Sequence, residues 1–519
     1  MRTYEEYVKA LHAMKPNIWI GNEKVGRDDP RIKGGIVIVK ETYDKAHDPE
    51  WEDICTATSH ITGEKINRFT HIHQSKDDLL KKQRMTRALC HRVGGCVQRC
   101  MGIDALNAIS VVTYECDQAL GTTYYQNFLN YMKMFQEKDL SASCASTDAK
   151  GDRSKRPSEQ ENPDAYLRVV ETREDGIVVR GAKQCITNTP YVDEIVAVPC
   201  RMMFPDDADY CVSFAIPADW DGVKLLARPA YHHIPDIPKE YIPRTLEIGD
   251  VETFIIFDDV FIPKERVFLN GQADPRQVPY AGFLALMFAH FHRHSYCGCK
   301  PAISEILASA SALVAEYNGI EQAKHAQEKI SHILGTAELV YAAGESSAFH
   351  SEKASSGTQV PDEILTNAGR RHAGEQIYDE YKILADLAGG MMATLPFMET
   401  FFNEEVGKDA FKYMQRNPRV KPENVVKCFK GIEALGCSEF GGLTQVAGLH
   451  GGGSPQMESI AMIKRYDFNK LKNIAKFLFG INDSLERIER QESPVTPRKL
   501  LENFGKSLKA KQDKSECKD

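Results

Sequence analysis

The chain has 519 residues, of which 42% are hydrophobic and 27% charged, and its net charge is −8 at pH 7. This length predicts two or three domains, and the acidic balance argues against nonspecific binding to nucleic acid or to anionic membranes. We find neither a long apolar run nor a signal-peptide core, so we expect no transmembrane helix and no secretion. The 14 cysteines should then be mostly reduced, as in a cytoplasmic protein.

The predicted elements change character twice along the chain. Residues 1–140 show apolar positions three and four apart, the spacing of amphipathic helices. Residues 141–275 open with a polar loop and continue as short β-rich segments separated by turns, which predicts an antiparallel β domain. Helical spacing returns over 276–490, and the charged tail, 491–519, is expected to be flexible. This order predicts an α+β protein with the layout of the acyl-CoA dehydrogenase fold, in which a central β domain lies between two helical domains.

The segment FAHFHRHSYCGCKPA concentrates residue types that bind metals. It holds three histidines and two cysteines within ten positions, His290, His292, His294, Cys297 and Cys299. On a continuous helix, His292 and Cys299 would share a face but lie roughly 10 Å apart along the axis, too far for one zinc ion. Either Gly298 breaks the helix, or the bound group is larger than one ion, such as an iron–sulfur cluster. A Cys297–Cys299 pair, a His290–His294 pair and purely structural histidines remain alternatives.

A second pair of cysteines, Cys96 and Cys100, lies in GGCVQRCMG. On a helix, residues four apart share a face, with their Cβ atoms about 5–6 Å apart, so the two thiols would point the same way. The alternative is two small core residues on one helix face. A lone pair with this spacing is a weaker metal signature than two cysteines three apart.

Several blocks of sequence point to one family when they are taken together. They are GCVQRCMGIDALNA, HRHSYCGCK, GEKINRFTHIHQSKDDLLKK, TDAKGDR, EDGIVVRGAK, FDDVFIPKERVFL, DLAGGMMATLP and LHGGGSPQ. They resemble the 4-hydroxybutyryl-CoA dehydratase (vinylacetyl-CoA isomerase) family, [4Fe-4S] flavoproteins distantly related to the flavin-dependent 4-hydroxyphenylacetate 3-monooxygenases. The resemblance implies that Cys96, Cys100, His292 and Cys299 hold the cluster and that Cys297 is a bystander. It also implies a homotetramer or homodimer with flavin at the subunit boundaries.

The same resemblance implies FAD as a second cofactor. Loop hydroxyls and amides can bond the edge of an isoalloxazine, and a glycine pair allows close approach to a phosphate. Each of these motifs by itself could equally be a polar turn or a helix end. The residues implied are Thr147, Asp148, Lys150, Asp152 and Arg153 in one segment, Thr187, Asn188 and Thr189 in a second, and Gly389, Gly390 and Thr394 in a third.

The family's reaction is a radical dehydration, because the β proton of a 4-hydroxyacyl-CoA is not acidified by the thioester. The resemblance implies that His292 is both ligand and base, and that Tyr296 donates a proton or bonds the substrate oxygen. Lys300 would balance negative charge. Glu252 would orient the imidazole or act as an acid, and Thr187 would bond the flavin or the thioester.

One departure from the family pattern concerns a glutamate expected before HGGGSPQ. Gln445 or Ala447 stands there instead, and neither transfers a proton near neutral pH; Glu439 is a candidate replacement. The prediction is therefore a [4Fe-4S]- and FAD-dependent lyase for a hydroxyacyl-CoA, with or without double-bond isomerisation. A flavin monooxygenase without a functional cluster and a non-catalytic protein with a structural zinc are the alternatives.

Overall fold

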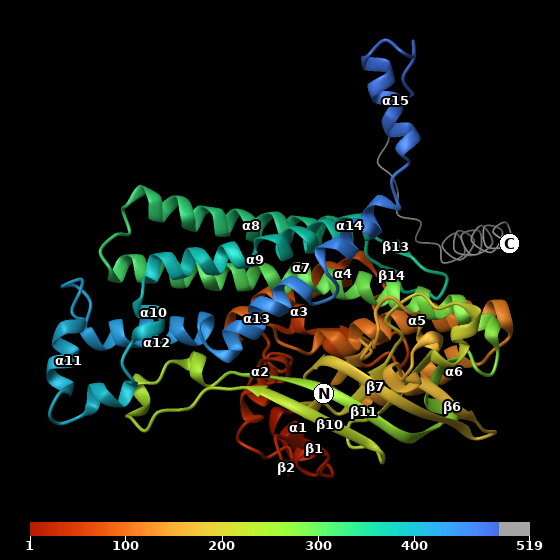
Figure 1. Cartoon of the computed structure of the whole chain (residues 1–519), viewed down its shortest axis with the longest axis horizontal. Helices are drawn as coiled ribbons and strands as arrows, with labels where there is room; N and C mark the ends of the chain where they lie inside the picture. The colour runs from red at the N-terminus through yellow and green to blue at the C-terminus, as the bar shows by residue number, and fades with distance from the viewer. Residues whose placement is uncertain (487–519) are drawn as a thin grey trace.

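The computed structural model describes residues 1–486, which combine helices and sheets as the sequence predicts (Figure 1). The N-terminal part is mainly helical, but it also contributes strands to the sheets. Its helices are α1 (Tyr4–His12), α2 (Lys33–Asp44), α3 (Glu52–Cys55), α4 (Lys76–Val93), α5 (Cys100–Leu120) and α6 (Tyr124–Glu137). Its strands are β1 (Ile18–Ile20), β2 (Glu23–Val25), β3 (Thr56–Thr58) and β4 (Lys65–Asn67).

Two sheets form the central β region. One has six strands in the order β2-β1-β10-β11-β7-β6, and the other has four in the order β12-β9-β8-β5. Their strands are β5 (Ala142–Ala145), β6 (Arg168–Thr172), β7 (Gly176–Thr187), β8 (Glu194–Ala197), β9 (Val212–Pro217), β10 (Val223–Ala230), β11 (Asp250–Pro263) and β12 (Val267–Asn270).

The pairing in these sheets departs from the expected antiparallel domain in two places. Strand β1 pairs with β10 in parallel, and β5 pairs with β8 in parallel. The two sheets share one apolar core, in which Phe214 of β9 meets Phe257 of β11 edge to face at 5.7 Å between ring centroids. Strands β1 and β2 of the N-terminal part therefore belong to the six-stranded sheet.

The C-terminal part is a bundle around one long helix, α7 (Val278–Tyr317). Helix α7 packs against α8 (Lys324–Phe349), α9 (Glu363–Ala388), α4 and α5. The remaining elements are β13 (Glu352–Lys353), β14 (Gln359–Val360), α10 (Met391–Thr394), α11 (Gly407–Met414), α12 (Pro422–Gly436), α13 (Glu439–His450), α14 (Pro455–Ile463) and α15 (Phe468–Leu478). Within residues 1–486, no helix has both the length and the apolar character needed to cross a membrane.

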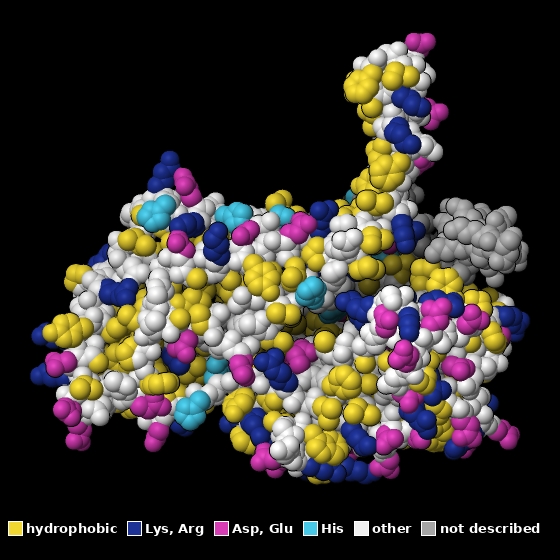
Figure 2. Space-filling view, viewed as in Figure 1, with side chains coloured by type: hydrophobic (Ala, Val, Ile, Leu, Met, Phe, Trp, Pro, Cys, Tyr) yellow, Lys and Arg dark blue, Asp and Glu magenta, His cyan; other side chains and the backbone are white. Residues whose placement is uncertain are grey.

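Helix α15 projects from the body of the molecule, as Figures 1 and 2 show. None of its residues is buried, although its sequence is amphipathic. Large apolar side chains are exposed on it and just after it, including Leu478, Phe479 and Ile481 at 70%, 76% and 68%. The flexible tail predicted for 491–519 lies outside the described residues.

Candidate functional site

Helix α7 carries His292, Tyr296, Cys299 and Lys300 without interruption. Of the two possibilities the sequence left open, a break at Gly298 does not occur. The glycine instead allows α4 to approach α7, because a Cβ atom there would lie 2.0 Å from Oγ1 of Thr86. His292 and Cys299 therefore face the same side of one continuous helix, two turns apart.

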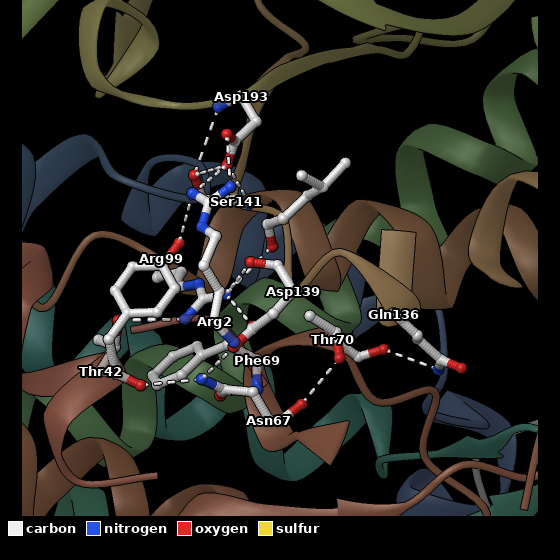
Figure 3. A network of polar contacts seen from close by, with 12 residues as sticks. Arg2, Thr42, Asn67, Phe69, Thr70, Arg99, Gln136, Asp139, Ser141 and Asp193 are labelled. Carbon is white, nitrogen blue, oxygen red and sulfur yellow. Dashed lines mark hydrogen bonds and ion pairs between the residues drawn. The ribbon is translucent and has the colours of Figure 1, made fainter. Parts of the chain in front are cut away.

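The other two predicted ligands lie at the turn between α4 and α5. Gly94 ends α4 in the left-handed conformation, and α5 begins at Cys100, so Cys96 is in the turn and not on a shared helix face. Arg99, next to Cys100, is buried and forms an ion pair with Asp139 (Figure 3). The guanidinium of Arg99 also lies 4.1 Å from the ring centroid of Tyr43. This anchor fixes the start of α5 and thus the position of Cys100.

The thiols of the turn and of α7 meet. The neighbouring thiol of Cys299, together with the backbone N–H of Gln98 at 3.4 Å from the Cys96 sulfur, lowers the pKa of Cys96. The neighbouring Cys96 thiol, followed by burial, raises the pKa of Cys299. Burial raises the pKa of Cys100 to about 12. A further cysteine that the sequence did not single out, Cys90 of α4, is fully buried beside this group.

Cys297 points away from the other thiols. A Cβ atom on Gly369 of α9 would lie 2.9 Å from the Cys297 sulfur, and one on Gly344 of α8 would lie 2.8 Å from its Cβ. Cys297 thus fills the contact between α7 and its two neighbouring helices. Burial raises its pKa to about 12.

His292 is held from one side by a carboxylate and stacked on an aromatic ring. Its Nδ1 lies 3.1 Å from Oδ2 of Asp104, and its ring lies 5.5 Å from that of Phe288. Asp104, rather than the predicted Glu252, is the carboxylate that contacts this imidazole. Gly452, with φ at +74°, passes the ring edge, where a Cβ atom would lie 3.0 Å from Cδ2 of His292.

Tyr296 and Lys300 are both engaged with protein partners. The Tyr296 hydroxyl donates to the carbonyl of Gly448 at 2.9 Å, and the guanidinium of Arg370 lies 4.1 Å from its ring centroid. Burial raises the pKa of Tyr296 above its usual range. Lys300 is fully buried in an ion pair with Glu380, so its charge is already balanced within the chain. Burial lowers the pKa of Lys300.

A pair of carboxylates lies at the start of β11. The hydroxyl of Thr187 donates to Oε1 of Glu252 at 2.6 Å, and the hydroxyl of Tyr191 donates to Oδ1 of Asp250 at 3.2 Å. Residues two apart on a strand face the same side. Burial raises the pKa of Glu252, and burial followed by the charge of Glu252 raises that of Asp250. The sequence analysis identified Glu252 and Thr187 but not Asp250.

The loop after β7 grips the cysteine turn. Asn188, in the left-handed conformation with φ at +67°, donates its side-chain amide to the carbonyl of Gln98. The Tyr191 hydroxyl, whose single proton can go to only one acceptor at a time, also lies against Oε1 of Gln98. Two buried acceptors of this loop, Oδ1 of Asn188 and Oγ1 of Thr189, have no hydrogen-bond partner among the described residues. The second predicted flavin segment therefore lies directly against the predicted ligand turn.

The first predicted flavin segment follows β5 and is only partly buried. Thr147 accepts a hydrogen bond from Gln184 through its backbone carbonyl, 2.8 Å away. Asp148 is buried and paired with Lys183 at 2.8 Å, which gives it a structural partner. Lys150, with φ at +73°, begins the turn, and beyond it the segment reaches the surface. The surface residues are Asp152 and Arg153.

The third predicted flavin segment is not brought together with the other two. Gly389 ends α9 with φ at +68°, and Gly390 follows it; both are exposed with open space around them. The hydroxyl of Thr394 donates to the carbonyl of Gly390 at 2.9 Å. In Figure 1 this segment, at α10, lies at the opposite end of the molecule from β7. One chain therefore presents the predicted flavin residues in two separate places.

The residues that replace the family glutamate do not supply an acid. The amide of Gln445 donates to the carbonyl of Gly436 at 3.1 Å, and Ala447 is exposed on α13. Glu439 is exposed at the first turn of α13. Across residues 1–486, no three His, Cys, Asp or Glu side chains converge in a way that would hold a single metal ion.

Two buried charged residues near the predicted ligands escaped the sequence analysis. Asp104 is four residues after Cys100 on α5, and Lys82 is on α4; their charged atoms lie 3.5 Å apart. Both are fully buried. The signal that marks them is a charged residue within the apolar face of a helix, and for Asp104 also its four-residue spacing from a candidate ligand.

Comparison with known proteins assigns the chain to a family. Models described as the N-terminal and C-terminal parts of 4-hydroxyphenylacetate 3-hydroxylase match residues 3–269 and 281–480. The 4-hydroxybutyryl-CoA dehydratase/vinylacetyl-CoA-Δ-isomerase of Clostridium aminobutyricum is 36% identical over 499 residues, which cover 93% of this chain and 100% of that protein. The chain belongs to this dehydratase family. As a member of the family, it is an enzyme of the carbon–oxygen lyase type.

Three further matches are a dehydratase structure and two oxygenase components of 4-hydroxyphenylacetate 3-monooxygenase. A solved structure of an oxygen-tolerant archaeal 4-hydroxybutyryl-CoA dehydratase from N. maritimus superposes with a TM-score of 0.89 at 33% identity, covering 95% of this chain and 98% of that one. The 4-hydroxyphenylacetate 3-monooxygenase oxygenase component of Thermus thermophilus is 29% identical, covering 80% of this chain and 84% of its own length. A structure of such an oxygenase component with FAD and 4-hydroxyphenylacetate shares the fold, with a TM-score of 0.82 at 24% identity, and covers 93% of this chain and 99% of its own.

Proposed function

We propose that the enzyme removes water from a hydroxyacyl-CoA of the 4-hydroxybutyryl-CoA kind, with a [4Fe-4S] cluster and FAD as cofactors. The observation that carries the proposal is the bond between Asn188 and Gln98. It holds the loop proposed for the flavin against the turn proposed for the cluster, so the two cofactors would be neighbours. A dehydration that needs both one-electron chemistry and a Lewis acid requires this proximity.

The chemistry of the donor set fits a cluster. The thiols of Cys96 and Cys299 are neighbours, and Cys100 begins α5 at the end of the same turn. Soft thiolates are the usual ligands of such clusters. His292, two helical turns from Cys299, would be the fourth ligand, and a cluster accepts ligands more widely spread than one ion does.

The loop after β7 fits the polar edge of a flavin. Oδ1 of Asn188 and Oγ1 of Thr189 are buried without partners among residues 1–486, and such atoms in a native protein usually await a ligand or water. The exposed segment 389–394 lies too far away to complete the same site. We propose that a second copy of the chain brings it there, as in a homotetramer or homodimer.

The exposed apolar residues of α15 support this self-association. A helix of 11 residues is not stable in water by itself, so its apolar face needs a covering surface. Leu478 and Phe479 are examples of side chains that the body of the same chain leaves uncovered. We propose another subunit as the covering surface.

When bound, the flavin would supply one-electron chemistry and the cluster a Lewis acid. Glu252 and Asp250 would hold a proton between them, because burial favours their neutral forms. The hydroxyl of Thr187 donates to Oε1 of Glu252 and thereby fixes the orientation of this carboxyl group. We propose Glu252 as the proton-transfer group. We propose Asp250 as the second carboxyl group for proton transfer, in place of the glutamate that the family pattern has before HGGGSPQ.

Tyr296 and Lys300 would act mainly by holding the site in shape. The Tyr296 hydroxyl fixes the end of α13 through Gly448, and Lys300 is neutralised by Glu380. His292 would keep its Nε2 for the ligand site, because its Nδ1 is engaged by Asp104.

The first test is purification without oxygen, followed by assays of iron, sulfide and flavin per chain and of water loss from 4-hydroxybutyryl-CoA. About four iron, four sulfide and one FAD are expected. Glu252→Gln should keep iron, sulfide and flavin but lose turnover. Gln445→Glu should keep both the cofactors and the turnover. Flavin without iron, even after reconstitution, would refute the cluster and favour a monooxygenase-like activity. A loaded enzyme without turnover on hydroxyacyl-CoAs would refute the substrate class.

A further inference from the structure

We infer that Asp104 and Lys82 form one buried positioning unit that sets the orientation of His292 and the charge beside Cys100. The inference rests on the proposed function, because His292 and Cys100 are proposed cluster ligands. Asp104 and Lys82 come from α5 and α4, the two helices that flank the cysteine turn. Both side chains have at most 1% of their surface exposed.

Asp104 of α5 faces three donors, two on α7 and one on α4. Oδ2 faces Nδ1 of His292 at 3.1 Å, and Oδ1 accepts the hydroxyl of Ser295 at 2.9 Å and lies 3.5 Å from Nζ of Lys82. An ionised carboxylate only accepts hydrogen bonds, so Nδ1 of His292 must carry the proton in this contact. Nε2 is then unprotonated and able to bind a metal, and Gly452, which has no side chain, passes beside this ring edge.

Lys82 lacks a complete set of partners in the chain. Its ammonium has no well-formed hydrogen bond among the described residues, although it lies beside Asp104 and the thiol of Cys100 and 5.3 Å from the ring centroid of Phe69. An ammonium buried in this way requires nearby negative charge. Asp104 supplies one charge, and a cluster carrying thiolate ligands would supply the rest.

The pair therefore connects two proposed ligands that lie on different helices. Asp104 contacts the imidazole, and Lys82 pairs with Asp104 and places a positive charge beside Cys100. Replacing Asp104 should loosen the histidine ligand, while replacing Lys82 should make the cluster harder to reduce because a positive charge beside it is lost. These two effects differ, so they can be measured separately.

The test compares Asp104→Asn, Lys82→Met and Lys82→Arg in the anaerobically purified, cofactor-loaded enzyme. Asp104→Asn should release iron to a chelator at least about tenfold faster than the parent enzyme. Lys82→Met should retain iron and shift the cluster's midpoint potential to more negative values, and Lys82→Arg should restore the potential.

The matched control is Glu363→Gln, which weakens the second histidine–carboxylate contact of α7, between His290 and Glu363 at 3.1 Å. His290 is two residues from His292 and so faces a different side of the helix. This variant should lose thermal stability without faster iron release. If Asp104→Asn does not fold, Ser295→Ala provides a milder test, because it removes one of the hydrogen bonds to Asp104. Its iron release should be faster than that of the parent enzyme and less than about tenfold faster.

Two outcomes would overturn the inference. Iron release from Asp104→Asn, or from Ser295→Ala in its place, that matches Glu363→Gln would show that Asp104 does not position a ligand. A potential unchanged by Lys82→Met would show that the ammonium does not sense the cluster. A parent enzyme that takes up no iron, even on reconstitution, would refute the proposed function and this inference together.

Discussion

Asn188 holds the backbone of Gln98 through its side-chain amide, so residues 90 positions apart lock two loops together. Because Asn188 has a positive φ of 67°, the position has two separable roles, a backbone conformation and a hydrogen bond. Asn188→Gly should lose the hydrogen bond but keep a residue that readily adopts this conformation, and lower the free energy of unfolding by about 1 kcal/mol. Asn188→Ala should lower it by about 1–2 kcal/mol more, because a Cβ atom disfavours this conformation. Urea unfolding measures both, and equal losses would contradict this division.

Thr189 offers a test of the flavin loop that does not depend on activity. Its buried hydroxyl has no partner among residues 1–486, so Thr189→Val should leave the stability of the flavin-free protein unchanged or higher. If the hydroxyl bonds FAD, the dissociation constant of FAD should rise about 5- to 10-fold. Thr253→Val is the matched control, since Thr253 is a buried threonine of β11 whose hydroxyl is likewise unpartnered there. Equal FAD affinity in the two variants would count against the role of Thr189.

Arg99 should contribute strongly to stability. Its ion pair with Asp139 is fully buried, and removing one partner of such a pair typically costs about 3–5 kcal/mol. Arg99→Met should therefore show a large drop in chemical-unfolding midpoint. The double variant Arg99→Met/Asp139→Asn should recover part of the loss, because no uncompensated carboxylate remains. A double variant less stable than Arg99→Met would show that Asp139 acts mainly through its other contacts, with Arg2 and Asn67.

His232 predicts one component of the acid sensitivity of the fold. Burial, followed by the charge of Lys430, lowers the pKa of His232 to about 4, whereas an unfolded histidine titrates near about 6.5. Between these values the unfolded state binds more protons, so stability falls as the pH drops from about 6.5 to about 4. The full difference is about 3 kcal/mol, which partial exposure reduces to about 1–2 kcal/mol.

Variants of this histidine provide the measurement. His232→Asn should show a flatter dependence of unfolding free energy on pH within that window than the parent enzyme. His233→Asn is the control, because its side chain is exposed next to the same site. If both variants follow the parent curve, His232 does not contribute to the acid transition.

The projecting helix α15 predicts the assembly state. The parent enzyme should sediment as an oligomer, and Leu478→Ser with Phe479→Ser should shift it toward monomer, since these side chains are mostly exposed in one chain. The control variant is Lys470→Ser with Lys472→Ser on the same helix. A parent enzyme that is monomeric at micromolar concentration, or an oligomer that the apolar changes do not affect, would contradict the proposed interface.

Local sequence patterns predicted where helices and strands lie along the chain better than which remote elements they pack against or pair with. The helical spacing around His292 was correct, but the role of Gly298 depends on Thr86 of a helix more than 200 positions away. Strand β1 was missed because its parallel partner β10 is equally remote, and three residues carry little periodicity. The glycine pair at 389–390 was assigned from its motif, but a motif does not state where a helix end lies in space.

The sequence predicted the site residues whose type alone indicates metal chemistry. It did not predict those whose role depends on being buried. Cysteines and histidines in short spacing identify themselves, whereas Asp104 and Lys82 look like ordinary helix charges until the packing shows that water cannot reach them. Asp250 is similar, because an acidic residue at the start of a strand is common. Its coupling to Glu252 follows from burial on one face of β11.

The contact between Gly298 and Thr86 helps to set the distance between α4 and α7, and with it the distance between the proposed ligands Cys96 and Cys299. A Cβ atom at residue 298 would lie 2.0 Å from the Thr86 hydroxyl oxygen and 3.1 Å from the backbone oxygen of Gln83, so this contact between α4 and α7 would have to rearrange. Helix α4 leads directly into the turn with Cys96, and α7 carries Cys299 one residue after the glycine. The absence of a side chain at residue 298 thereby helps to set the distance between Cys96 and Cys299. A substitution there would change that distance without replacing either cysteine.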